Sequence, residues 1–502
     1  MTRSLLGAAL AACTTGICST GCSWIVGSFE ECLTAAECQE GQLCVDQLCV
    51  AHPPCRSNAG CRAEYGYGSI CQDGSCEFAA VEPACSATEP VELAATLGGE
   101  LPRGSMMGAV FKLGTPKEAA RAAAVRLAVR EINGAGGIAG TPLRLIVCDM
   151  DVDQNAVNDV EETQKTISYL AGRLGVQLIV GPSSSANTTA AVSVLLREQL
   201  DTVLISPSAT SSSLTYLIDR LHAEDSLGLL WRTCPSDALQ SAVLASHLEP
   251  YSSAAILYQR DVYGQGLEEA LRSRLLPTHS AFSRSFEADG SDVDAAVEVA
   301  RASGPRDALV IISSDARRTV ALLDRASRTA ELSQLPVFLS DGSKDATTLF
   351  DPNLTEATRR MVRGARGTAP ARPEGLAYDT FANNLASQFS VDAAAFSFLA
   401  HSYDAAYAGA LGITHASMAA TFQGAQVAEG LSRLSMGAPV RLGPTGFTEA
   451  VSRVRAGETV NVEGTSGALD FDAGTGEAPG PIETWKVSEA GDSFETISVV
   501  TP

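Results

Sequence analysis

The run from Ile132 to Gly140 constrains the fold of this chain more than any other segment. An alanine-rich helical pattern leads into it, clustered glycines interrupt that pattern, and the apolar residues 143–147 follow directly. A helix that ends in glycines and leads into a buried strand is typical of an α/β unit. The same alternation predicts strands at 108–113, 143–147 and 177–180 and helices at 117–133 and 156–174. We therefore expect a doubly wound parallel sheet.

Two apolar runs of this pattern end in small hydroxyl residues. The strand at 177–180 leads into Gly-Pro-Ser-Ser-Ser at 181–185, and the run 203–205 leads into Ser-Pro-Ser-Ala-Thr at 206–210. The carboxyl ends of parallel strands meet at one edge of the sheet, where open α/β sheets bind small molecules. These two loops are therefore the first candidates for a binding site.

Composition excludes one class of partner and indicates a compartment. The chain has 502 residues, enough for two or three domains, and a formal net charge of -22. So acidic a protein repels phosphate backbones, which argues against nucleic-acid binding. Of the 14 cysteines, all but Cys148 and Cys234 lie in the first 85 residues. So many cysteines in so short a segment indicate an oxidising compartment.

The first residues resemble an export signal. Arg3 is followed by the apolar run 5–12, which is too short to span a membrane. The segments ending in Leu-Ala-Ala-Cys13 and Ser-Thr-Gly-Cys22 both resemble the lipobox of bacterial lipoproteins. We predict a signal peptide at 1–21 and a lipid anchor on Cys22, with Cys13 as the alternative. A plain secretory signal, with these cysteines in disulfides, stays open. No later run predicts a transmembrane helix.

A cysteine-rich module is expected at 22–85. Two units, Cys32 to Cys49 and Cys55 to Cys76, share the same spacing between their first two and their last two cysteines. These gaps are longer than zinc modules usually have, so disulfides are favoured over zinc, with the connectivity left open. Cys85 has no evident partner, and Cys148 could pair with Cys234 if the two are adjacent. Residues 86–105 show no sustained period and are expected to form a linker.

An ordered series of motifs along about 106–500 resembles one family. It comprises 132–140, 149–156, 181–185, 205–210, 231–237, 261–266, 403–407, 464–467 and 471–472. In this order the motifs resemble the type I periplasmic solute-binding proteins, and most closely the leucine/isoleucine/valine-binding proteins that feed ABC transporters. The resemblance implies two α/β lobes joined by three crossovers, with the ligand in the cleft between them. Lobe 1 would comprise 106–235 and 364–480, and lobe 2 would comprise 236–363 and 481–502.

The resemblance also implies the residues that contact the ligand. Ser184, Ser185 and Ala186 match the loop that holds a ligand carboxylate, and Ser208, Ala209 and Thr210 match a second carboxylate-and-amine loop. Tyr263 matches an aromatic ring that closes over the ligand, and Asp341 falls where an acid often binds the ligand's amino group. Asp315 stands near a position that often holds an aromatic residue, and the loop 114–116 is shorter than usual and lacks a ligand-contacting aromatic residue. Together these departures argue against a branched-chain amino acid and indicate a more polar ligand or none. Helix capping by the serines and a purely structural tyrosine are the alternatives.

The expected function is binding rather than catalysis. The chain shows no serine elbow, no metal-spaced histidine pair and no phosphate-loop lysine, so we predict no enzyme activity, catalytic residue, metal or cofactor. The prediction is an exported, lipid-anchored protein, in the periplasm or on the cell surface, that captures an amino acid or similar small polar ligand for an ABC permease. The alternative is a ligand-binding sensor or surface interaction lipoprotein, because transport does not need the cysteine-rich segment.

Overall fold

The computed structural model describes residues 31–33, 37–39, 42–45, 47–51, 54–97, 105–151, 159–221, 226–276, 278–371, 373–419 and 423–501. The chain divides into two compact units, of which the first ends at Ala51 and the second begins at His52. The predicted signal peptide and both candidate lipidation sites, Cys13 and Cys22, lie outside the described residues. Within the described part of the chain, no helix combines the length and apolarity that a bilayer crossing requires.

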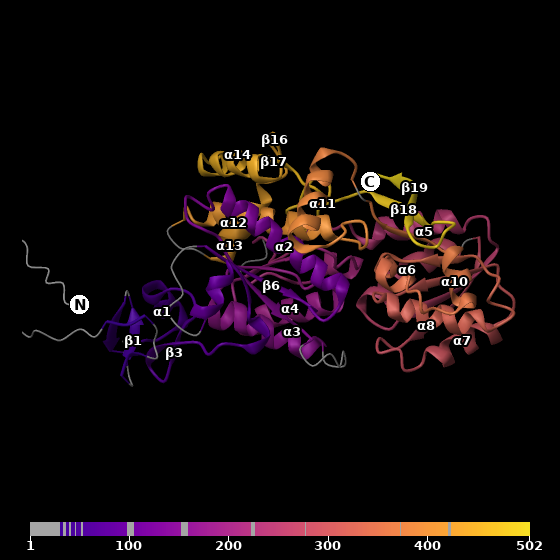
Figure 1. The fold of residues 1–502 in the computed structure, drawn as a ribbon, viewed down its shortest axis with the longest axis horizontal. Helices are drawn as coiled ribbons and strands as arrows, with labels where there is room; N and C mark the ends of the chain where they lie inside the picture. The colour runs from indigo at the N-terminus through magenta and orange to yellow at the C-terminus, as the bar shows by residue number, and fades with distance from the viewer. Residues whose placement is uncertain are drawn as a thin grey trace, which may run out of the picture. The chain divides into compact units, whose positions relative to one another are not determined.

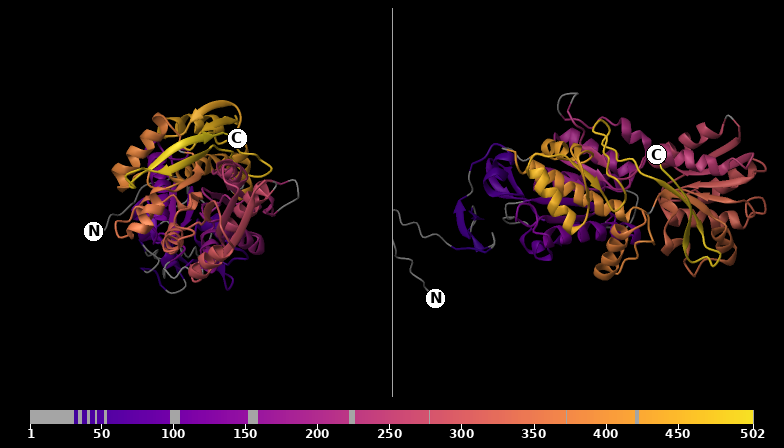
Figure 2. Two further views of the ribbon diagram at one scale, coloured as in Figure 1. Left: turned by 90° about the vertical axis from the view of Figure 1, so that its right-hand side faces the viewer. Right: turned by 90° about the horizontal axis from the view of Figure 1, so that it is seen from above.

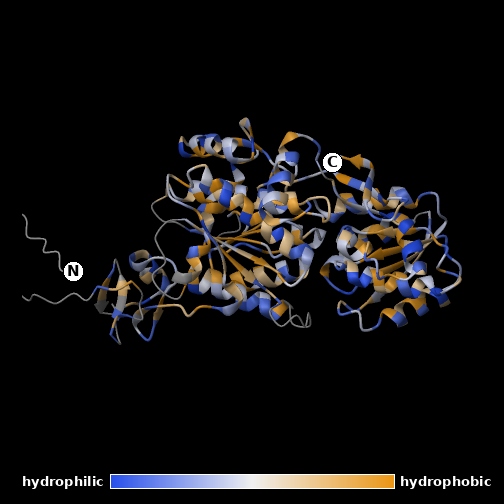
Figure 3. Ribbon diagram, in the orientation of Figure 1, coloured by the Kyte–Doolittle hydropathy of each residue, from blue (hydrophilic) through white to orange (hydrophobic). Residues whose placement is uncertain are grey.

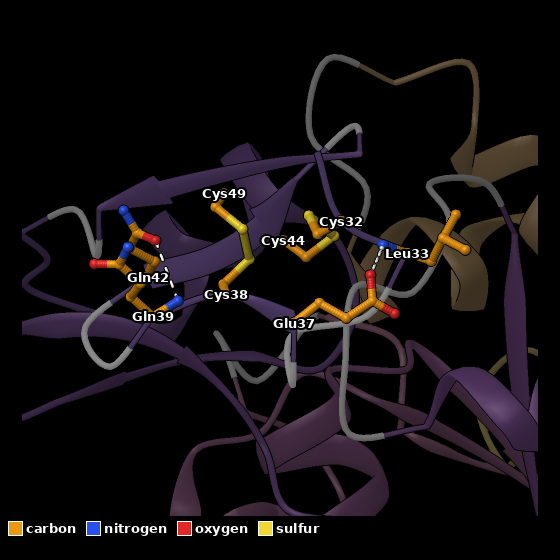
Figure 4. Close-up of a disulfide and its surroundings, with 8 residues drawn as sticks. All are labelled: Cys32, Leu33, Glu37, Cys38, Gln39, Gln42, Cys44 and Cys49. Carbon is orange, nitrogen blue, oxygen red and sulfur yellow. Dashed lines mark hydrogen bonds between the residues drawn. A yellow bond between two sulfur atoms is a disulfide. The ribbon is translucent and has the colours of Figure 1, made fainter. Parts of the chain in front are cut away.

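The first unit is a disulfide-linked hairpin. Strands β1 (Gln42–Val45) and β2 (Leu48–Ala51) pair antiparallel. Disulfides join Cys32 to Cys44 and Cys38 to Cys49, and Figure 4 shows both beside the hairpin. The buried residues of its small core are Cys32, Cys44 and Cys49, so covalent links replace a hydrophobic core here. The predicted disulfide framework is confirmed.

The second group of cysteines belongs to the other unit, so the stretch 22–85 is not one module as we expected. Helix α1 (Asn58–Tyr65) and strands β3 (Ser69–Gln72) and β4 (Ser75–Phe78) are linked by the disulfides Cys55–Cys71 and Cys61–Cys76. A guanidinium nitrogen of Arg62 donates to the carbonyl of Gly172 at 2.8 Å, and the Tyr67 hydroxyl donates to Gln177 at 3.1 Å. These contacts fix the group to lobe 1, and sequence spacing carries no sign of them.

The expected linker at 86–105 is instead partly ordered structure. It contains strand β5 (Ala87–Glu89) and the 3-10 helix η3 (Val91–Thr96), preceded by η2 (Pro83–Cys85). Strand β5 pairs antiparallel with β7 of lobe 1, and Cys85 forms a disulfide with Cys148. The suggested Cys148–Cys234 pairing is therefore wrong, and Cys234 is a buried free thiol. Elements this short leave no period in the sequence.

Lobe 1 is built on a six-stranded sheet in the order β10-β9-β8-β6-β7-β5. All pairs except β5 with β7 are parallel. The strands are β6 (Met106–Phe111), β7 (Arg144–Asp149), β8 (Leu178–Val180), β9 (Val203–Ser206) and β10 (Leu230–Arg232). The expected doubly wound sheet is present, with element boundaries shifted by one to three residues.

Helices cover both faces of this sheet, as Figure 1 shows. One face carries α2 (Pro116–Gly134), α11 (Leu376–Phe389), α12 (Leu399–Ala416), α13 (Gly424–Ser432) and α14 (Pro444–Arg455). The other carries α3 (Asp159–Ile167), the π-helical η4 (Ser168–Leu174) and α4 (Ser185–Glu198). Alternate residues of β6 enter opposite cores: Met107, Ala109 and Phe111 face the first helix layer, and Met106 and Val110 face the second. Outside the sheet lie η5 (Ser212–Tyr216) and the pair β16 (Ala438–Arg441) and β17 (Val460–Glu463).

Lobe 2 repeats the architecture with the sheet order β12-β11-β13-β14-β15-β18-β19. Its strands are β11 (Ser253–Gln259), β12 (Ser280–Phe286), β13 (Ala308–Ile312), β14 (Val337–Leu339), β15 (Arg366–Pro370), β18 (Ile482–Val487) and β19 (Phe494–Val500). Its helices are α5 (Asp237–Leu248), α6 (Val262–Leu275), α7 (Val293–Ala302), α8 (Ala316–Ser327), η6 (Asp341–Ser343), α9 (Ala346–Leu349) and α10 (Glu356–Arg363). Figure 3 shows apolar strands at the centre of both lobes.

The chain passes three times between the lobes: after β10, after β15 and between β17 and β18. The last passage carries the C-terminal strands into the lobe 2 sheet, as the right-hand view of Figure 2 shows. The segments that connect the lobes therefore lie next to the ends of β10 and β15. This arrangement places the loops after the lobe 1 strands opposite those after the lobe 2 strands.

Candidate functional site

A cleft with a free volume of about 170 Å³ lies between the two lobes. One water-sized group needs on the order of 10–15 Å³ by this measure, so the cleft has room for a small metabolite. Lobe 1 lines it with Lys112, Gly114, Thr115, Pro116, Lys117, Glu118, Arg121, Met150, Ser183, Ser184, Ser185, Asn187, Ser208 and Phe398. Lobe 2 lines it with Tyr263, Ser314, Asp315, Arg317, Asp341, Gly342, Asp345 and Thr348.

The loop after β8 brings the serines to the cleft. Gly181 starts this loop at a φ of +95°, and a Cβ there would lie 2.4 Å from the carbonyl oxygen of Val110, so only glycine fits. Ser184 is the N-cap of α4, and its hydroxyl accepts the N–H of Asn187 at 3.2 Å. The capping alternative is thus correct for Ser184. It does not exclude binding, because the first N–H groups of a helix lack partners within the helix and attract anions.

Arg121 presents a positive charge at the same edge. Its guanidinium pairs with Glu118 at 2.5 Å, donates to the Ser208 hydroxyl at 3.1 Å, and lies 5.0 Å from the centre of the Phe398 ring. The Ser208 hydroxyl in turn donates to the carbonyl of Ser183 at 3.0 Å. Arg121 is only 4% exposed, and these contacts hold its guanidinium group in place. The two serine loops and α2 therefore form one positively charged wall.

Asp341 and Asp315 stand on the lobe 2 wall. One oxygen of Asp341 accepts the Tyr263 hydroxyl at 2.5 Å and the Gln240 amide at 2.8 Å. Asp315 is the N-cap of α8 and pairs with Arg317 at 2.8 Å. Burial works to raise the pKa of Asp315, but the hydrogen bonds from Arg317 and the charge of Lys117 outweigh it and hold the pKa below its ordinary value.

The structure places six of the nine predicted site residues in the lining of one cleft: Ser184, Ser185, Ser208, Tyr263, Asp315 and Asp341. The other three lie elsewhere. Ala186 is half-buried in α4, Ala209 is fully buried in the lobe 1 core, and Thr210 is 1% exposed and is not among the lining residues. That these residues contact a ligand stays a prediction.

Sequence reasoning missed three charged residues on α2 and the buried Asp237. Lys117, Glu118 and Arg121 face the cleft from a helix whose alanine-rich pattern indicated only a core-packing role. The available signal was their clustering at i, i+1 and i+4 in the first two turns of an otherwise apolar helix. Asp237 is fully buried at the start of α5, and its backbone N–H donates to the carbonyl of Thr210 at 2.8 Å.

Asp237 is expected to destabilise the protein as the pH rises. Burial raises its pKa well above the ordinary value, and the charge of Asp341 raises it further. A raised folded-state pKa gives stability that is present below the unfolded pKa of about 3.9 and is lost as the pH rises through the folded pKa. We expect Asp237→Asn to increase the free energy of unfolding at pH 8 by about 1–3 kcal/mol. Urea unfolding at pH 8 and pH 4 checks this, and an equal gain at both pH values would contradict it.

The two walls of the cleft carry opposite charge. Lobe 1 contributes the cations Lys112, Lys117 and Arg121 against one carboxylate, Glu118. Lobe 2 contributes the carboxylates Asp315, Asp341 and Asp345 against one cation, Arg317. Such a cleft attracts polar ligands and orients a ligand whose charge is uneven, with its anionic end toward lobe 1.

Comparisons with known proteins identify the family of this chain. Residues 120–480 match the family described as receptor family ligand binding region. The chain is 26% identical over 373 residues to the chemotactic signal transduction system substrate-binding protein BasB of Halobacterium salinarum, covering 70% of this chain and 78% of that protein. It is 28% identical over 186 residues to an amino acid binding protein of Pseudomonas aeruginosa, covering 35% of this chain and 44% of that protein.

A solved structure supports the fold. The isoleucine complex of the branched-chain amino acid transporter substrate-binding protein LivJ from Streptococcus pneumoniae superimposes with a TM-score of 0.61. It is 18% identical in sequence, and the superposition covers 80% of this chain and 100% of that one. The predicted two-lobed type I periplasmic-binding fold is thereby confirmed.

Proposed function

This chain belongs to the family described as "receptor family ligand binding region", and we propose a function from that membership. The protein captures an amino acid or similar small polar ligand between its lobes. The observation that carries the proposal is the division of charge across the cleft, with the serine loops and Arg121 on one wall and the acids on the other. A carboxylate fits the first wall, because helix N-termini and arginine bind carboxylates strongly.

The proposed role is delivery of the ligand to an ABC permease from a lipid-anchored position on the membrane. The LivJ structure, whose description names an amino acid transporter, supports a transport role, and the amino acid binding relative supports the class of ligand. A second candidate, a sensor, is favoured by the relative whose name places it in a chemotactic signal transduction system. Uptake of the bound compound by cells, lost on deletion of the gene, favours transport, whereas loss of a behavioural response with normal uptake favours sensing.

The first experiment is a thermal-shift screen of the purified protein against amino acids and small organic acids. A ligand that binds only the native state raises the melting temperature by mass action, by an amount that grows with its concentration over Kd. Hits are then measured by calorimetry. If no small polar compound shifts the melting temperature at millimolar concentration, the proposal is wrong.

We expect Arg121→Ala to weaken binding of a confirmed hit about 10- to 100-fold, the usual value of a hydrogen bond to a charged group. The matched control is Arg126→Ala on the same helix, because Arg126 pairs with Glu89 and does not line the cleft. The control is expected to leave Kd unchanged. Equal Kd values for the two variants would show that Arg121 does not bind the ligand.

A further inference from the structure

Lys117 reaches across the cleft from lobe 1 to lobe 2. Its ammonium donates to the carbonyl oxygen of Ser314 at 2.8 Å and to that of Gly342 at 3.1 Å, and the side chain is buried. These carbonyls belong to the residues next to Asp315 and Asp341. They form the corner that a ligand's amino group was expected to occupy.

The acids of this corner already have partners within the protein. Asp341 accepts from Tyr263 and Gln240, and Asp315 is paired with Arg317. An incoming ammonium would have to share this corner with the ammonium of Lys117.

The surrounding charges make that sharing unfavourable. Burial lowers the pKa of Lys117 and Arg121 lowers it further, while Glu118, Asp315 and Asp345 oppose the change. A second cation nearby would add to the like-charge repulsion that Lys117 already meets. The lobe 2 wall therefore favours ligands without an ammonium group.

The lobe 1 wall, by contrast, has hydrogen-bond donors without a partner among the described residues. The side-chain amide nitrogen of Asn187 and the hydroxyl of Ser183 are buried and have no hydrogen-bond partner among the described residues. Both residues line the cleft. A buried donor without a partner is costly, so a ligand that accepts hydrogen bonds from it gains accordingly. One oxygen of Glu118 is also without a partner among the described residues, and it suits a hydroxyl group of the ligand.

We propose that Lys117 takes the place of the ligand's ammonium group, so that the cleft binds a small carboxylate that lacks an amino group. The inference rests on the proposed function and narrows its ligand class. Lobe 1 would hold the carboxylate through Arg121, Asn187 and the start of α4. Lys117 would hold the lobes together over the ligand through its bonds to Ser314 and Gly342.

The test uses pairs of compounds that differ only at the amino group: pyruvate and L-alanine, 4-methyl-2-oxopentanoate and L-leucine, and 2-oxoglutarate and L-glutamate. Calorimetry with the full chain measures Kd for each. In at least one pair we expect the oxo acid to bind about tenfold or more tightly than its amino acid, as like-charge repulsion predicts. Lys117→Met should reduce or reverse that preference.

The control variant is Lys112→Met, which removes another cation that lines the cleft and should keep the preference for the oxo acid. If the wild-type protein binds the amino acid of every binding pair more tightly, the inference is wrong while the proposed function stands. If all six compounds fail to bind, the inference is wrong, and the wider thermal-shift screen decides the proposed function separately. If Lys117→Met fails to fold, the Kd values of the wild-type protein for each oxo acid and its amino acid decide the inference.

Discussion

Replacing Cys85 and Cys148 together by alanine is expected to lower the free energy of unfolding by about 4 kcal/mol, because their disulfide closes a long loop. The two residues are 63 apart in sequence, and both are fully buried. Without the link, the unfolded chain regains the entropy of that loop. Strand β5 is then held to lobe 1 by its pairing with β7 and by the ion pairs of Glu89 with Arg126 and Arg130. Urea unfolding under non-reducing conditions measures the loss.

The matched control is the pair Cys55 and Cys71, which are 16 apart and close a much shorter loop. Its replacement by alanine should cost about 3 kcal/mol, about 1 kcal/mol less than the longer link. An equal or smaller loss for Cys85 and Cys148 would show that loop entropy is not the main contribution. Because β5 and this disulfide are built into lobe 1, a truncation that tests the cysteine-rich segment must end at Ala51.

The fold could be predicted because its signals repeat along the chain. Apolar strands such as β6 and β8 are buried on both faces and alternate with amphipathic helices, and that alternation is visible without coordinates. The N-terminal part gave weaker signals. A three-residue strand such as β5 has no period of its own, and it is a strand only because β7 offers it an edge.

The residues of the candidate site also fall into a group that could be predicted from the sequence and a group that could not. Ser184, Ser185 and Ser208 were predictable because loops at strand ends have a recognisable composition. Lys117 and Arg121 were not, because charged residues on a helix usually face solvent. Both are buried by segments distant in sequence: Lys117 donates to the carbonyls of Ser314 and Gly342 in lobe 2, and Arg121 contacts Ser208 and Phe398. Likewise, no sequence pattern shows that Tyr263 and Gln240 occupy an oxygen of Asp341. Such contacts depend on the approach of elements distant in sequence.

Arg232→Met is expected to destabilise the protein by about 3–5 kcal/mol, the usual loss when one partner of a buried ion pair is removed. Arg232 is 1% exposed and donates to the carbonyls of Ala209 and Ser211 at 2.9 and 3.0 Å. It also pairs with Glu477, which precedes the third passage between the lobes. Removal of the guanidinium leaves these buried acceptors without their donor. Urea unfolding provides the measurement.

The same substitution is expected to weaken ligand binding, because the residues that Arg232 holds also position the cleft. The backbone N–H of Ser211 donates to the Ser185 hydroxyl at 3.2 Å, and the Ser211 hydroxyl donates to the carbonyl of Val262 in lobe 2 at 3.1 Å. Loss of the guanidinium therefore loosens a link between a cleft serine and the helix that carries Tyr263.

The double variant Arg232→Met with Glu477→Leu separates two causes of the stability loss: the unpaired charge of Glu477 and the lost hydrogen bonds of Arg232. If the unpaired charge dominates, the double variant is more stable than Arg232→Met alone. If the double variant is less stable, the lost hydrogen bonds to Ala209 and Ser211 dominate, and the ion pair is secondary.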